Sequence, residues 1–416
     1  MKRLGILHIA DLHCSGAGSG GVVGDVKDET VSDVLASELT YKDAQDVFFR
    51  GAQNLFRKEP VDVIACTGDL GQGAYPETLR LGVLYLAKLA DKLGVKREKV
   101  IVAPGNHDLC RDADAGEELS EFIRACRKAG FKCAERTKPA CLSIKGVPMV
   151  ALNTCLGGTE HAFHGLPDSF WNAAVSSVRQ MELLGRDTTM GLPADLRAQL
   201  EAMDIPAIGW SQLDSMLRHL NKAKANCAVV VAHHSPTPTP NIEVRPYGLL
   251  VDSGPFIFGL MEGGRRVLLL HGHAHCDSAL TAQTPQAPEP GFIATIGSRG
   301  LHGNGGAKVS HVQLLITEDR NFLMAVVSRF EQQGSAFHRM ESFYIWDSPG
   351  SAVQVELDLD KLDRNHQYLF SEIANALGVP GDESLADRLL RLSNRRQLSV
   401  TNITNSHKKW IVTRIG

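Results

Sequence analysis

Short apolar runs alternate with amphipathic stretches along the first part of the chain. The opening run over residues 4–10 predicts a buried strand, and further strands are predicted at VDVIACTGD, KVIVAPGNHD, PMVALNT, CAVVVAHH, RVLLLHGHAH and GFIATIGS. Between them, small or apolar residues recur at helical spacing over 44–56 and about 77–93, which predicts two amphipathic helices. This alternation is typical of a layered α/β domain. After residue 310 strand follows strand, which predicts antiparallel hairpins at the end of the sheet.

Two regions depart from this rhythm. Residues from about 158 to 204 carry mostly helical patterning, and we interpret them as an insertion that could cover a site. From about residue 351 the pattern is strand, helix, helix and hairpin, which predicts a small α+β domain over 351–416 after a main domain over 1–350. Basic residues near the C-terminus, together with Trp410, could touch nucleic acid or a protein partner. A solvated helix face is the simpler interpretation.

Composition narrows the class of protein. The 416 residues are 43% apolar and 22% charged, as in an ordinary globular protein, and no segment approaches the run of about 18–20 apolar residues that spans a membrane. The net charge of −3 argues against a protein whose whole surface binds nucleic acid, but it is compatible with a local groove that does. Nine cysteines without a CxxC pair predict reduced thiols and a cytoplasmic location.

Five short polar motifs each end one of the apolar runs. They are Asp11 with His13, Asp69 after Gly68, the GNHD segment 105–108, the pair His233–His234, and the GHAH segment 272–275. Ligand sites in α/β sheets form at the carboxyl ends of strands, so these motifs can converge. Their carboxylates, imidazoles and amide, with no thiolate, suit divalent ions such as Mn²⁺, Fe²⁺ or Zn²⁺. These groups are too many for one ion and suit two, provided that one carboxylate bridges the two ions.

In this order the motifs D-x-H, GD, GNHD, H and GHxH resemble those of the calcineurin-like metallophosphoesterases. The resemblance covers roughly residues 1–330, and none of the family's motifs is missing. It implies a four-layer α/β/β/α sandwich of two mixed sheets, with two metal ions at one sheet edge. It also implies a metal-dependent phosphoesterase, for which Mn²⁺ is the favoured ion and Fe, Zn or Mg are alternatives.

The resemblance also implies how the ligands divide. The first ion would take Asp11, His13 and His275. The second would take Asn106, His273 and one histidine of the HH pair, and Asp69 would bridge both ions. We favour His233 as that ligand because it directly follows the apolar run, which leaves His234 to touch substrate. The family's H-x-P spacing would instead select His234.

The same resemblance implies a mechanism for hydrolysis. A hydroxide bridging the two ions would attack phosphorus in line with the leaving oxygen. His107, beside Asn106, is the candidate proton donor to the leaving group, and Asp108 could orient the His107 ring or raise its pKa.

The residue before GNHD bears on the substrate. Protein phosphatases of this superfamily typically have an arginine there, whereas this chain has Pro104. Without that bidentate clamp for a dianionic monoester, we expect hydrolysis of phosphodiester bonds in nucleic acid or nucleotides, with DNA or RNA as the partner. The opening ILHIADLH also resembles the exonuclease branch of the family. The alternatives are a phosphomonoesterase acting on a nucleotide, metabolite or phosphoprotein, and an inactive scaffold with the same fold.

Overall fold

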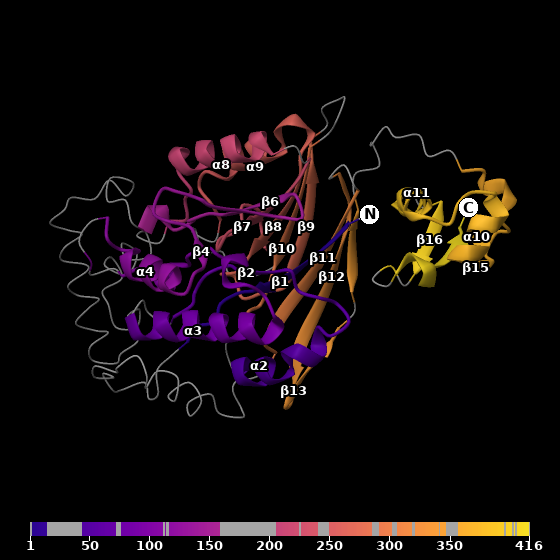
Figure 1. Cartoon of the computed structure of the whole chain (residues 1–416). Coiled ribbons are helices and arrows are strands. Elements are labelled where there is room, and N and C mark those ends of the chain that lie inside the picture. Colours follow the sequence, from indigo (N-terminus) through magenta and orange to yellow (C-terminus); the bar gives the residue numbers. More distant parts are fainter. Residues whose placement is uncertain are drawn as a thin grey trace.

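Two mixed β-sheets face each other in the computed structural model of the protein (Figure 1). The described residues are 2–14, 44–71, 76–110, 113, 116–158, 205–223, 226–239, 249–284, 291–301, 306–317, 321–340, 342–346, 357–394, 397–401, 403 and 406–415. Apart from Gly158, the predicted insertion at about 158–204 lies outside them.

The first sheet has eight strands in the order β13-β12-β11-β1-β2-β3-β4, with β14 paired to β12. Strands β1 to β4 run parallel, whereas β11 to β14 form antiparallel pairs, which confirms the predicted hairpins. The strands are β1 (Lys2–Ile9), β2 (Val63–Cys66), β3 (Val100–Val102), β4 (Lys132–Cys133), β11 (Lys308–Ile316), β12 (Phe322–Gln333), β13 (Ala336–Arg339) and β14 (Phe343–Trp346).

The second sheet has six strands in the order β5-β6-β7-β8-β10-β9. Its four central strands run parallel, and each edge strand is antiparallel to its neighbour. The strands are β5 (Ala140–Ile144), β6 (Val147–Ala151), β7 (Cys227–Val231), β8 (Arg266–His271), β9 (Ser278–Gln283) and β10 (Phe292–Gly297). Apolar side chains of both sheets, such as Ile6 of β1 and Val229 of β7, share one buried cluster between them.

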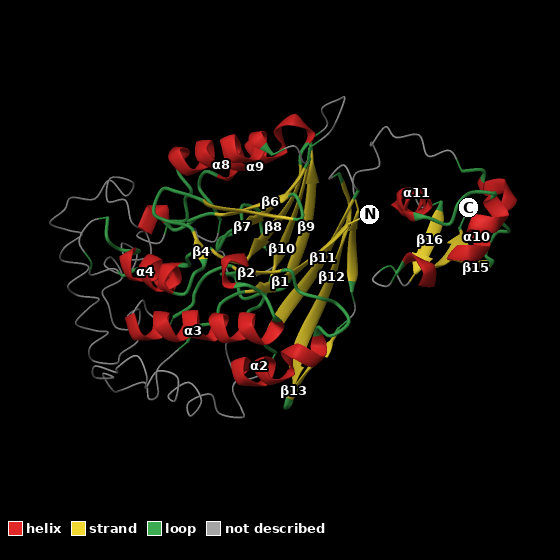
Figure 2. Ribbon diagram, in the orientation of Figure 1, coloured by secondary structure: helices red, strands yellow, loops and turns green. Residues whose placement is uncertain are grey.

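Helices cover the outer face of each sheet, which confirms the four-layer α/β/β/α sandwich (Figure 2). On the first sheet lie α2 (Ala44–Leu55), α3 (Pro76–Leu93) and α4 (Ser120–Lys128); on the second lie α8 (Trp210–Lys222) and α9 (Ser253–Met261). The described residues also include the short turns η1 (Arg97–Lys99), η2 (Asn106–Asp108), η3 (Leu156–Gly158) and η4 (Glu262–Gly264). None of the described helices is long and apolar enough to span a membrane.

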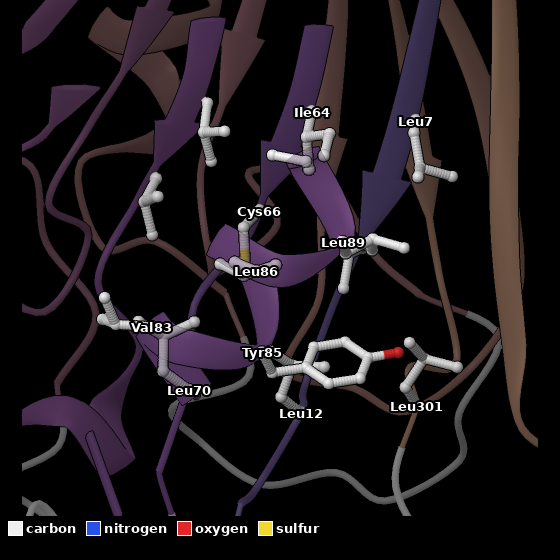
Figure 3. Close-up of a cluster of buried hydrophobic side chains, with 14 of the residues drawn as sticks. Leu7, Leu12, Ile64, Cys66, Leu70, Val83, Tyr85, Leu86, Leu89 and Leu301 are labelled. Carbon is white, nitrogen blue, oxygen red and sulfur yellow. The ribbon is translucent and has the colours of Figure 1, made fainter. Parts of the chain in front are cut away.

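Helix α3 shows why these segments fold as predicted. Its residues Val83, Leu86 and Leu89 recur at intervals of three and pack toward Leu7 and Ile64 of the first sheet (Figure 3). A helix presents such positions on one face, and burying that face supplies most of its stability.

The C-terminal residues form a separate three-stranded sheet in the order β15-β17-β16. Its elements are η5 (Leu359–Lys361), β15 (Gln367–Leu369), α10 (Phe370–Leu377), α11 (Glu383–Asn394), β16 (Leu398–Thr401), η6 (His407–Lys409) and β17 (Ile411–Arg414). This matches the predicted series of strand, helix, helix and hairpin. Its apolar core is continuous with Leu315, Leu323, Met324 and Val326 of the first sheet. The boundary at residue 351 stays a prediction.

Truncating Leu86 tests the packing of α3 against the sheet. Because Leu86 is fully buried, we expect Leu86→Ala to lower the free energy of unfolding by about 2–5 kcal/mol, measured by urea denaturation. Arg80→Ala, at an exposed position of the same helix, is the matched control and should change it by less than about 0.5 kcal/mol. Equal effects of the two substitutions would contradict this packing.

Candidate functional site

The parallel strands carry all five polar motifs to one edge of the two sheets. Strands β1, β2 and β3 are neighbours in the first sheet, and Asp11, Asp69 and Asn106 follow their carboxyl ends. Strands β7 and β8 are neighbours in the second sheet, and His233 and His273 follow theirs. Residues separated by up to 262 positions in the sequence therefore meet in one place.

The polypeptide turns sharply at these positions. Seven described residues other than glycine have a positive φ, and five of them belong to the motifs: Asp11 (47°), His13 (45°), Asp69 (52°), His273 (65°) and His275 (46°). Residues with a side chain adopt this left-handed region at an energetic cost, and such strain clusters at functional sites. Backbone bonds hold the turns in place: the N–H of Asp11 donates to Gly68 O (3.2 Å) and that of His13 to Asp69 O (2.8 Å).

One group of ligating atoms comes from Asp11, His13, Asp69 and His275, and these atoms all lie within 4.8 Å of one another. His13 Nε2 is 3.3 Å from His275 Nε2 and 3.6 Å from Asp69 Oδ2. His275 Nε2 is 3.8 Å from Asp11 Oδ1. Asp11 is fully buried, and its Oδ2 accepts no hydrogen bond from any described residue.

A second group lies on the other side of Asp69. Ligating nitrogens of His233, His234 and His273 lie within 4.8 Å of one another. His233 Nε2 is 3.0 Å from Asn106 Oδ1, 3.2 Å from His273 Nδ1 and 3.4 Å from Asp69 Oδ2. Asp69 Oδ2 therefore faces His13 of the first group and His233 of the second, as a bridging carboxylate would.

The two neighbouring histidines differ in what holds them. His233 Nδ1 lies 2.7 Å from Thr67 O, and because a carbonyl only accepts, Nδ1 must donate that bond. The lone pair of His233 is then on Nε2, which faces the oxygens of Asn106 and Asp69. His234 Nδ1 is instead 2.9 Å from Thr154 Oγ1, and its buried Nε2 has no hydrogen-bond partner among the described residues.

The structure brings His107 to the same place. Its backbone N–H donates to Asp69 Oδ1 (2.9 Å), and its half-buried ring stands edge-on to that of His13 at 4.9 Å between centroids. Asp108 has other partners: its carboxylate accepts from the N–H groups of Leu70 (2.8 Å), Gly71 (3.3 Å) and Gly105 (2.9 Å). Asp108 thus ties two loops together, and a direct role on the His107 ring stays a prediction.

Burial sets the protonation of the site. Burial, and then the charge of Asp69, raises the pKa of Asp11 well above its ordinary value. Burial also acts to raise the pKa of Asp69, but His233, His107 and His13 outweigh it and hold this pKa below its ordinary value.

Burial also acts on the histidines of the second group. It lowers the pKa of His273 to about 3, with a further contribution from His233, and it lowers that of His234 well below its ordinary value. Neutral imidazoles keep the lone pair that metal coordination requires.

Two glycines permit the close approach of the loops. A methyl group at Gly105 would overlap the Asp69 carboxylate, and one at Gly272 would lie 2.8 Å from Asp11 Oδ2. Both follow a predicted strand, which is the signal that marked their motifs. Thr67 and Thr154 were missed because each acts through hydrogen bonds to histidines that are distant in the sequence. The only feature of the sequence that marks these two threonines is that Thr67 follows β2 and Thr154 follows β6.

These features fit divalent metal ions. Nε2 of His233 faces two oxygens, and the buried Asp11 Oδ2 accepts no hydrogen bond from the described residues. The atoms of these two groups that could ligate a metal include no thiolate. A bound cation would stabilise acceptor atoms that lie this close to one another. All the predicted ligand residues lie in this place, and the ligand assignment itself stays a prediction.

Comparison with known proteins gives one family. The model of the calcineurin-like phosphoesterase family matches residues 4–277. No curated protein matches the chain. Among solved structures, a protein from Staphylococcus aureus described as a 5′-nucleotidase, in complex with alpha-ketoglutarate, is 13% identical with a TM-score of 0.40. That match covers 88% of this chain and 59% of the other, so the chain spans less than two thirds of that protein.

Substituting Gly105 tests the contact between the loops. Because its methyl group would push against the Asp69 carboxylate, we expect Gly105→Ala to weaken the binding of Mn²⁺ by about 10- to 100-fold, measured by metal titration. Gly254→Ala is the matched control, since nothing lies within 4 Å of that added methyl group. Unchanged affinity in Gly105→Ala would show that this contact does not position Asp69.

Proposed function

The chain belongs to the calcineurin-like phosphoesterase family, and on that premise we propose that it hydrolyses phosphodiester bonds of nucleic acid or nucleotides. The observation that carries the proposal is the convergence of two groups of ligating atoms on Asp69 Oδ2. A dinuclear site needs such a shared carboxylate, since an amide such as Asn106 offers a single neutral oxygen.

In this proposal Asp11, His13 and His275 hold one divalent ion, and Asn106, His233 and His273 hold the other, with Asp69 between them. Bound ions would supply Lewis acidity at the phosphoryl oxygens and a water of lowered pKa. His233 is preferred to His234 because its Nε2 faces both Asn106 and Asp69. His234 is left to contact the substrate. Mn²⁺ is the ion proposed for the first experiments.

His107 is the proposed acid that protonates the leaving oxygen. It is the half-buried histidine of GNHD, and its backbone bond to Asp69 fixes it beside the reacting centre. A ring edge-on to His13 can reach a phosphoester held by the ligands on either side. General acid catalysis of this kind contributes about 10²–10⁴-fold to the rate.

The preference for diesters rests on charge. The position before Gly105 is the buried Pro104, where an arginine would clamp a second phosphoryl charge. In the described part of the chain, the ion pairs of Asp11 and Asp69 are all with histidines. A diester carries one negative charge fewer than a monoester dianion and depends less on such a clamp.

A cytoplasmic location remains part of the proposal.

The first test compares two chromogenic substrates on metal-stripped protein restored with Mn²⁺. We expect kcat/KM for bis(p-nitrophenyl) phosphate to exceed that for p-nitrophenyl phosphate, because Pro104 stands where an arginine would clamp a dianion. Asp69→Asn should lower both by about two orders of magnitude or more, since it removes charge from the reacting centre. A preference for the monoester would instead favour a phosphomonoesterase, and no turnover of either would favour a scaffold.

A second test isolates the proposed acid. Nitrophenolate is a good leaving group that needs no proton, whereas an alkoxide must be protonated as it leaves. His107→Ala should therefore lower kcat by about 10²–10⁴-fold for a substrate with an alkyl leaving group and much less for one that releases nitrophenol. His338→Ala, at an exposed histidine of β13, is the control and should leave both rates unchanged. Equal losses on both substrates would assign His107 to binding and not to proton transfer.

A further inference from the structure

The C-terminal elements have an arrangement unrelated to the metal centre. Strand β15 leads into α10, a short turn leads into α11, and the hairpin β16–β17 follows, with β17 paired antiparallel to both other strands. The match to the phosphoesterase family ends at residue 277, before this region. Two helices joined by a tight turn, followed by a hairpin on a three-stranded sheet, make a helix-turn-helix with a wing.

The turn between the helices is built by local chemistry. Gly378, with φ of 66°, ends α10, and its N–H donates to Asn375 O (3.1 Å), while that of Val379 donates to Ala374 O (3.0 Å). Asp382 begins α11, since its Oδ1 accepts from the N–H groups of Ser384 (3.0 Å) and Leu385 (3.1 Å). Such caps fix where each helix ends.

The residues of α11 divide into two faces. The apolar positions are buried in the core that the helix shares with the first sheet, and they are Leu385, Ala386, Leu389, Leu390 and Leu392. Positions 384 and 388, four residues apart, lie on the opposite side of the helix. Ser384 there is exposed and Arg388 is half-buried. One side of α11 thus holds the domain together, and the other is polar.

The wing is held rigidly against the helices. Trp410 is fully buried, its carbonyl accepts from the N–H of Phe370 (3.1 Å), and the two rings are 6.1 Å apart. Directly before it, the turn η6 carries Lys408 and Lys409, which are both exposed. A buried aromatic anchor next to exposed lysines fixes two positive charges relative to α11.

Charge is distributed unevenly along the chain. Residues 382–416 contain seven basic and three acidic residues, whereas residues 1–381 contain 37 basic and 44 acidic ones. The basic residues are Arg388, Arg391, Arg395, Arg396, Lys408, Lys409 and Arg414, and the acidic ones are Asp382, Glu383 and Asp387. The whole stretch 351–416 has nine basic and eight acidic residues, and Arg414 is paired with Asp360 (2.8 Å), so the attraction for a polyanion is local to α11 and the wing.

We propose that α11 and the β16–β17 wing form a binding surface for double-stranded DNA. The major groove of B-form DNA admits an α-helix, and phosphates beside the groove complement Arg388 of α11 and the lysines of the wing. The deep, narrow major groove of duplex RNA does not admit a helix, so DNA is the matching ligand. DNA binding by this surface does not depend on which phosphoester the metal centre hydrolyses.

Binding is measured by fluorescence anisotropy with a labelled 24-base-pair DNA duplex, the full-length protein and EDTA, over a series of salt concentrations. We expect affinity to fall steeply with salt, and the double variant Lys408→Glu/Lys409→Glu to bind about tenfold or more weakly with a salt slope smaller by about 2. Arg388→Glu should weaken binding as well. Lys361→Glu, at an exposed lysine outside α11 and the wing, is the control and should bind as the unsubstituted protein does.

Three results would overturn the proposal: absence of duplex binding at low salt, equal affinity in the wing variant, or binding of single-stranded DNA or duplex RNA as tight as that of duplex DNA. Equal melting temperatures of the variants exclude unfolding as the cause of any loss. Because EDTA prevents turnover, this experiment is separate from the test of hydrolysis. Asp69→Asn should bind the duplex normally while losing activity, so the two proposals fail independently.

Discussion

The candidate site depends on keeping two carboxylates, Asp11 and Asp69, buried beside each other at the ends of adjacent strands. Burying such charges costs several kcal/mol unless they are paired. Backbone N–H groups meet part of that cost: His273 donates to Asp11 Oδ1 (3.0 Å) and His107 to Asp69 Oδ1 (2.9 Å). The lowered pKa values of His234 and His273 keep these two rings uncharged, so a divalent cation bound here would supply the positive charge beside the carboxylates.

This arrangement is possible because the scaffold around it is rigid. Asp11, Asp69 and His273 have left-handed backbone conformations, and each comes shortly after a buried strand, β1, β2 or β8. Gly105 and Gly272 let the loops approach to distances that a side chain would prevent. Asp108 then joins the loops after β2 and β3 through three backbone bonds. Strain at the site is therefore offset by packing elsewhere in the same two sheets.

Much of this could be predicted from the sequence, because strands and helices follow local patterns. The first strand nevertheless spans Lys2–Ile9 and not residues 4–10, since Lys2 and Arg3 pair with Ile316 and Leu315, far along the chain. The site residues could be predicted since polar motifs ended apolar runs. The bonds of Asp108 to Leu70, and of Thr67 to His233, could not be predicted, because they join residues whose separation depends on the order of the strands.

The apolar core shared by the C-terminal domain and the first sheet makes the two parts one folding unit. Leu315, Leu323, Met324 and Val326 are almost fully buried, and the C-terminal leucines belong to the same cluster. Removing the domain would expose these side chains on the first sheet and create an apolar patch that favours association. A shortened chain would then aggregate for reasons unrelated to any ligand. Selection against misfolding would therefore preserve this domain whether or not it binds a ligand.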